Sequence, residues 1–219
     1  MVPSAAPPGW RVESYAAAVG GGAVALLAGP PPRLRTVAPR VGPVVTLPLM
    51  PGQYHLPAST DDRLSVIDRL STLPFPLTEE RPGSDGTWGG PGYHLAVLRE
   101  SQDFWEDRGE EIVEAAESEI EADLATLAAV LTGRWGEPES VDLSPFLGFD
   151  NPDPDFVAPE PLGSLSGLAG AMQVWRLPSC DRWIALAIGQ ADPEWPIWLL
   201  AAVGEASALP QARPAPRAQ

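Results

Sequence analysis

Lysine is absent from this chain of 219 residues, and all fourteen of its basic residues are arginine. A primary amine is the central group of the P-loop phosphate site, of the protein-kinase strand lysine and of Schiff-base catalysis, so these classes are excluded. Asparagine occurs once, at Asn151, while alanine, glycine and proline are abundant. This composition indicates a GC-rich bacterial genome.

Cysteine and histidine are also scarce. The single cysteine, Cys180, cannot form an internal disulfide, which fits a reducing compartment and excludes a cysteine-rich zinc module. His55 and His94 do not form an HExxH pattern, so we predict neither a metal site nor a cofactor. The apolar stretch at 16–28 is too short and too rich in glycine to span a membrane. These features favour a cytoplasmic protein without a membrane contact.

Proline and glycine are frequent, at 27 and 21 residues, which predicts long irregular segments between the regular elements. Residues 1–9 are expected to form a flexible lead-in and residues 205–219 a disordered tail, because both are rich in proline and alanine without apolar periodicity. Residues 10–204 would form a single domain. An alternative arrangement divides the chain near Gly92, within the glycine-rich loop expected at 81–92.

The apolar pattern predicts an α+β fold. Three apolar runs separated by short polar breaks, at 172–177, 183–188 and 197–203, are typical of an antiparallel β-meander. In the N-terminal half, a helix is expected to begin after Ser59 and to end before Pro74. Further strands are predicted at 24–28, 34–38, 41–49 and 93–98. The connection at 137–168 is long enough to cover the surface or a site.

An acidic segment from Asp103 to Asp123 carries ten carboxylates and one basic residue, Arg108. Apolar residues at the helical period predict one long amphipathic helix over 101–134, with Ser101 as its N-cap and Trp105 on its apolar stripe. The segment contributes a charge of minus nine to a total of minus fifteen. We expect this helix to pack against the meander.

The sequence contains no recognisable set of catalytic residues, so it favours a non-catalytic protein. Our first hypothesis is a protein-binding module of the immunity or antitoxin type, whose acidic helix engages a basic protein. The total charge disfavours binding to nucleic acid. The predicted partner-binding residues are Asp103, Asp107, Glu110, Glu114, Glu121 and Trp195.

Two alternatives belong to other classes. In the first, an enzyme or small-ligand protein has a pocket roofed by residues 137–168, in which Asp123 pairs with Arg176 or His94. Asp123 draws attention because it projects toward the apolar side of the predicted helix. In the second, the tryptophan-rich meander mediates assembly, as a scaffold protein or a homo-oligomer.

Overall fold

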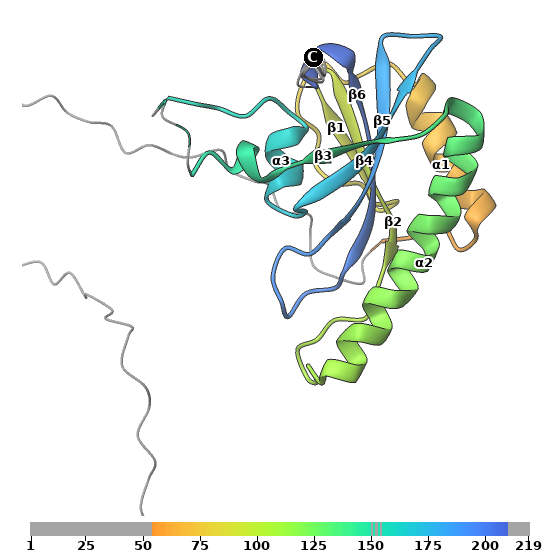
Figure 1. Cartoon of the computed structure of the whole chain (residues 1–219), viewed down its shortest axis with the longest axis vertical. Helices are drawn as coiled ribbons and strands as arrows, with labels where there is room; N and C mark the ends of the chain where they lie inside the picture. The colour runs from red at the N-terminus through yellow and green to blue at the C-terminus, as the bar shows by residue number, and fades with distance from the viewer. Residues whose placement is uncertain (1–53, 150, 152, 154, 210–219) are drawn as a thin grey trace, which may run out of the picture. The chain divides into compact units, whose positions relative to one another are not determined.

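The computed structural model describes residues 54–149, 151, 153 and 155–209 (Figure 1). The predicted lead-in at 1–9, the three strands predicted before residue 50 and residues 210–219 of the predicted tail lie outside this range. Within it, the predicted α+β fold is confirmed.

A six-stranded sheet forms the centre of the described fold, and every neighbouring pair of strands is antiparallel. The order across the sheet is β1-β2-β6-β5-β4-β3. The last three strands form the predicted meander, in which β5 lies between β4 and β6. The strands are β1 (Thr87–Gly90), β2 (Tyr93–Glu100), β3 (Glu139–Asp142), β4 (Ala171–Leu177), β5 (Arg182–Gly189) and β6 (Trp198–Glu205).

Helix α1 (Thr60–Thr72) begins at the predicted cap. The Ser59 hydroxyl accepts a hydrogen bond from the Asp62 backbone N–H at 3.1 Å, and the Asp62 carboxylate accepts one from the Ser59 N–H at 3.2 Å. This reciprocal capping box fixes the first turn of the helix. The other helical segments are α2 (Glu110–Trp135), α3 (Leu162–Ser166) and the 3₁₀ turns η1 (Ser144–Leu147) and η2 (Ala206–Ala208).

Both faces of the sheet are covered (Figure 1). On the first, which we call the α2 face, residues such as Ile184, Leu186 and Val203 pack against α1 and α2. On the opposite α3 face, residues such as Ala185, Trp183 and Trp198 pack against α3 and the segments beside it. Since the side chains of a strand alternate between faces, two covered faces explain why β6 is apolar along nearly its whole length.

The long acidic helix begins later than predicted. Ser101 does not cap it, because the Ser101 N–H donates to the Ile197 carbonyl and its hydroxyl accepts from the Ile197 N–H. Phe104 is fully buried, and its N–H donates to the Glu194 carbonyl. These bonds hold residues 101–104 against the chain that leads into β6, so α2 starts only at Glu110.

Three other predictions need correction. Residues 81–92 are not all loop, since they contain β1, and residues 137–168 contain β3, η1 and α3. The fold also continues beyond Gly204, the predicted end of the domain. Strand β6 ends at Glu205, η2 follows, and the side chain of Leu209 is buried in the core of the α3 face. None of the described helices has the length and apolar character required to cross a membrane.

Candidate functional site

Seven of the ten carboxylates in the acidic segment are exposed and have no hydrogen-bond or ion-pair partner among the described residues. The remaining three, Asp107, Glu119 and Asp123, make contacts within the protein. The seven form what we call the acidic surface. They are Asp103, Glu106, Glu110, Glu111, Glu114, Glu117 and Glu121.

Four carboxylates of the acidic surface form one row along α2. Glu110, Glu114, Glu117 and Glu121 are three or four residues apart, which places them on one side of the helix. Like charges at this spacing destabilise a helix by about 0.2–0.5 kcal/mol per pair. No arginine of the described fold bonds to the row. The row is therefore a source of strong negative potential whose internal repulsion no described arginine relieves.

The predicted partner-binding residues occupy three different environments. Glu110, Glu114 and Glu121 belong to the row on α2. Asp103 and Asp107 lie in the segment before α2, where Asp107 Oδ1 accepts the Gly109 N–H at 2.9 Å.

Trp195 is half-buried and packs against the core of the α3 face. Its carbonyl oxygen accepts a hydrogen bond from the Gln190 side-chain amide at 2.7 Å. Trp195 thus packs the loop between β5 and β6 against the core of the α3 face.

Trp105 is the residue of this surface that the sequence pattern misassigned. It was expected on the buried stripe of the helix, but its exposed fraction is 57%. The neighbouring Phe104 takes the buried position instead, because residues 101–109 are not helical. A large exposed aromatic side chain among carboxylates is suited to contact an arginine or lysine, since its ring face attracts cations.

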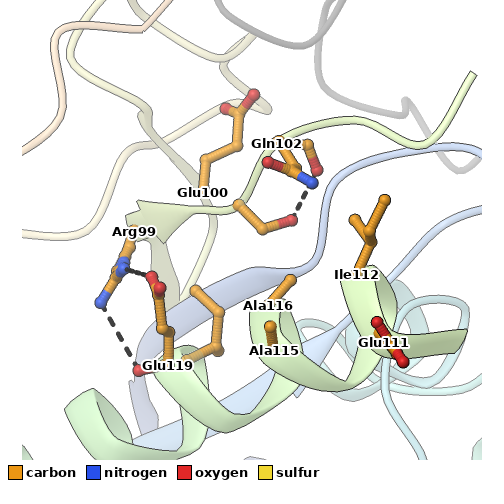
Figure 2. A pocket seen from close by; sticks show the side chains of 10 residues that line it. Arg99, Glu100, Gln102, Glu111, Ile112, Ala115, Ala116 and Glu119 are labelled. Atoms are coloured by element: carbon orange, nitrogen blue, oxygen red, sulfur yellow. Dashed lines mark hydrogen bonds and ion pairs between the residues drawn. The ribbon is translucent and has the colours of Figure 1, made fainter. Parts of the chain in front are cut away.

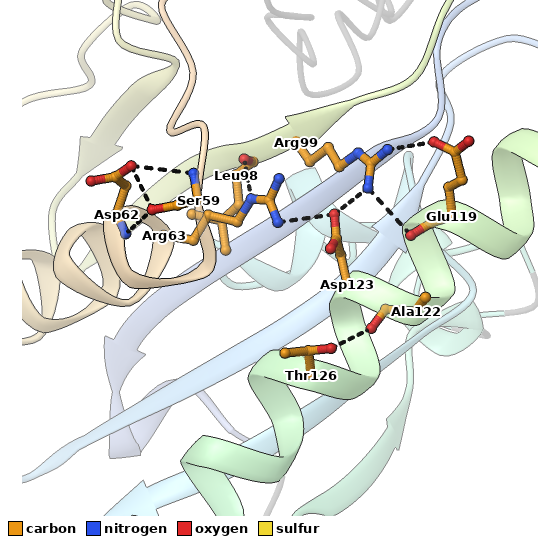
Figure 3. Close-up of polar contacts among 9 residues, drawn as sticks. All are labelled: Ser59, Asp62, Arg63, Leu98, Arg99, Glu119, Ala122, Asp123 and Thr126. Carbon is orange, nitrogen blue, oxygen red and sulfur yellow. Dashed lines mark hydrogen bonds and ion pairs between the residues drawn. The ribbon is translucent and has the colours of Figure 1, made fainter.

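Asp123 lies at the centre of an ion-pair network that joins α1, β2 and α2 (Figure 3). Its carboxylate bonds to the guanidinium groups of Arg63, at 2.9 Å, and Arg99. Arg99 also bonds to Glu119 at 2.5 Å, and Arg63 donates from Nε to the Leu98 carbonyl at 3.3 Å. The hydrogen bond to Asp123 raises the pKa of Arg99, against the opposing effect of burial.

A β-bulge directs Arg99 toward this network. The register of β2 against β6 shifts between Val97 and Arg99, which leaves Leu98 as the extra residue. Val97 pairs with Leu200 on the α3 face, whereas Arg99 pairs with Leu199 on the α2 face. Without the bulge, strict alternation would direct Arg99 away from α2.

The structure does not bring the three residues of the predicted pocket together. Asp123 is bound by Arg63 and Arg99, whereas Arg176 is exposed and pairs with Glu139 at 3.3 Å. His94 is buried on β2 beside the ring of Phe75, at a centroid distance of 5.2 Å. The His94 pKa is lowered mainly by burial.

The connection over residues 137–168 also lies on the other side of the sheet from Asp123. Its residues Leu143, Leu162 and Leu165 are buried in the core of the α3 face. Asp123 projects from α2, whose buried residues belong to the α2 face. The connection contributes apolar packing, and it does not cover Asp123.

A groove runs along α2 on the side away from the carboxylate row (Figure 2). Its volume is about 470 Å³. The helix contributes small and apolar side chains and the two carboxylates of Glu111 and Glu119, and the end of β2 with the two residues after it forms the opposite wall. The lining residues are Arg99, Glu100, Ser101, Gln102, Glu111, Ile112, Ala115, Ala116, Glu119 and Ile120.

Comparisons of the chain with protein-family models, with curated proteins and with solved structures gave no match. Among the described residues, no group of three or more histidine, cysteine, aspartate or glutamate side chains is arranged to hold a metal ion. Within the described part of the chain, the acidic surface and the groove beside it are the candidate functional features.

Proposed function

We propose that this chain is a protein-binding module whose acidic surface engages a cationic partner protein. The observation that carries the proposal is the set of seven exposed carboxylates without a partner in the described fold. On a helix surface, a glutamate gains about 0.2–0.5 kcal/mol from an arginine or lysine three or four residues away. Here the stretch from Glu110 to Asp123 contains no basic residue.

The arginines near the acidic surface do not neutralise it. Arg99 pairs with Glu119 and Asp123, and Arg108 pairs with Glu194 on the loop before β6 at 3.2 Å. The remaining negative charge attracts positively charged proteins over roughly a Debye length, about 8 Å at physiological ionic strength. Such a surface accelerates association and selects against acidic partners.

Trp105 supplies an apolar contact inside this charged surface. Exposed charge pairs contribute at most about 1 kcal/mol each, so charge alone gives weak and salt-sensitive binding. Tryptophan is enriched among the residues that dominate binding energies at protein interfaces. An arginine of the partner stacked on Trp105 and bonded to a neighbouring carboxylate would combine both contributions.

A capture experiment from the source organism tests the proposal. The bait is the full chain, compared with a triple variant Glu110→Arg, Glu114→Arg and Glu121→Arg. A matched control carries Glu80→Arg, Glu137→Arg and Asp181→Arg, three exposed positions outside the acidic surface. Both variants have the same net charge, so a general charge effect appears in both.

We expect the wild type and the control to retain a basic protein that the α2 variant loses. Circular dichroism should show that all three baits are folded, since each substitution is at an exposed position. If the triple variant on α2 retained the same proteins as the wild type, the acidic surface would not be part of the interface.

A further inference from the structure

We propose that the groove beside α2 binds an extended segment of the cationic partner, in which two basic residues flank one apolar residue. This inference rests on the proposed function and specifies the chemistry of the segment that docks. The groove is lined along its length by one helix and one extended segment (Figure 2).

The charge of the lining favours a cation. On the α2 side of the groove, two carboxylates, from Glu111 and Glu119, accompany one guanidinium, that of Arg99, whereas Glu100 pairs with Trp198 and points toward the α3 face. Arg99 is held by bonds to Asp123 and to Oε2 of Glu119, so it is not available to an anionic ligand in the groove. Glu111 has no partner within the described fold, and no hydrogen bond occupies Oε1 of Glu119.

The spacing of the carboxylates suggests the length of the occupant. Glu111 and Glu119 are eight residues apart on α2, which corresponds to about 12 Å along the helix axis. In an extended peptide, residues i and i+4 point to the same side and are about 13 Å apart. Two basic residues at that spacing match the two carboxylates.

Between the two carboxylates, the helix exposes a small apolar surface. Ala115 and Ala116 lie midway between Glu111 and Glu119 (Figure 2). Ile112 and the buried Ile120 also line the groove. In an extended segment, residue i+2 points to the same side as residues i and i+4. An apolar side chain at that position would contact the alanines. The segment therefore has the pattern basic-x-apolar-x-basic.

Two labelled peptides test this pattern by fluorescence anisotropy with the full chain. The first contains Arg-Ala-Leu-Ala-Arg between glycines, and the second contains the same residues as Arg-Arg-Ala-Ala-Leu. The blocking variant is Ala115→Phe, which fills the groove at an exposed position without a change of charge. The control is Ala125→Phe, which is also at an exposed position of α2 but does not line the groove.

We expect the wild type and Ala125→Phe to prefer the spaced peptide by about tenfold, the effect of placing one apolar side chain in a groove. Ala115→Phe should bind both peptides with equal affinity. Equal affinities in the wild type, an absence of binding, or a preference that persists in Ala115→Phe would overturn the proposal.

The outcome for the groove can be distinguished from that for the proposed function. Reversal of the row at Glu114 and Glu121 should weaken both peptides to the same extent, because the row supplies only long-range attraction. If both peptides bind equally and both are weakened by this reversal, the acidic surface is supported and the groove is not. If charge reversal in the row leaves capture of the partner unchanged but Ala115→Phe abolishes capture, the groove is supported and the row is not.

Discussion

Replacement of Asp123 by asparagine should destabilise the fold more than any other single charge removal in the acidic segment. Asp123 neutralises Arg63, whose side chain is 9% exposed, and Arg99, whose side chain is 28% exposed. Removal of one partner from a buried ion pair costs about 3–5 kcal/mol, because the remaining charge stays buried without compensation.

The structure reduces that estimate. The side chain of Asp123 is itself 20% exposed, and Arg99 retains its bond to Glu119 while Arg63 retains the Leu98 carbonyl. We therefore expect Asp123→Asn to lower the free energy of unfolding by about 2–3 kcal/mol. For a domain of this size that corresponds to a fall in Tm of roughly 4–12 °C.

Urea denaturation followed by tryptophan fluorescence measures this loss, since Trp175, Trp183 and Trp198 are buried. Glu119→Gln is the comparison, because its side chain is 68% exposed and its removal should cost less than about 1 kcal/mol. The double variant Arg63→Met and Asp123→Leu should recover most of the stability, as it removes the two charges of the inner pair together. Equal stabilities of Asp123→Asn and Glu119→Gln would refute this reasoning.

Three further predictions concern the core and the acidic surface. Gly204→Ala should destabilise by about 1–3 kcal/mol in urea denaturation, since the added Cβ would lie 2.4 Å from Cζ2 of buried Trp183. Gly133→Ala in α2, where the added Cβ would have no atom within 4 Å, should instead raise the free energy of unfolding by up to about 1 kcal/mol. Equal effects of the two substitutions would contradict the close contact between Gly204 and Trp183. Burial lowers the pKa of His94, and nearby Arg182 adds to this, whereas the Pro74 and Leu73 backbone and Glu80 oppose it. The folded state therefore binds fewer protons than the unfolded state, so the free energy of unfolding should fall as pH decreases below about 6.5. If a His94→Gln variant kept the same pH dependence, His94 would not be its source. Trp105→Ala should leave Tm within about a degree of wild type, because the side chain is 57% exposed, yet weaken partner binding measured by titration; a large loss of Tm would place Trp105 in the core.

The meander and the first helix were predictable because their signals are local. The three C-terminal strands are continuous apolar runs with polar breaks, and Ser59 with Asp62 forms a capping box that a short sequence window contains. Both signals depend on residues close together in the chain. The structure confirms these strands and this helix start within one or two residues.

The start of α2 was not predictable in the same way. Ser101 is a favourable N-cap by type, and the residues after it match a helical period. The competing interactions come from Glu194 and Ile197, far away in the sequence, which bond to residues 101–104. The consequence is that Phe104 is buried, Trp105 is exposed, and Asp103 and Asp107 lie outside the helix.

The partners of Asp123 could not be predicted from the sequence for a related reason. The sequence pattern placed Asp123 on the inner side of the helix, but it suggested Arg176 or His94 as the partner, whereas the structure pairs Asp123 with Arg63 and Arg99. The bulge at Leu98 moves Arg99 to the α2 face, and a bulge has no signature in the alternation of residues 93–98. Arg63 is buried through the packing of α1 against α2, which is a tertiary effect.

The most direct test of the central claim is the ionic-strength dependence of the association rate between this chain and its captured basic partner. Surface plasmon resonance should be recorded between about 0.01 M and 0.15 M salt, where the Debye length falls from about 30 Å to about 8 Å. If the acidic surface guides binding, the association rate of the wild type falls steeply with salt. The variant with arginine at 110, 114 and 121 should associate slowly at every salt concentration. An association rate that is independent of salt and equal in both proteins would contradict the account.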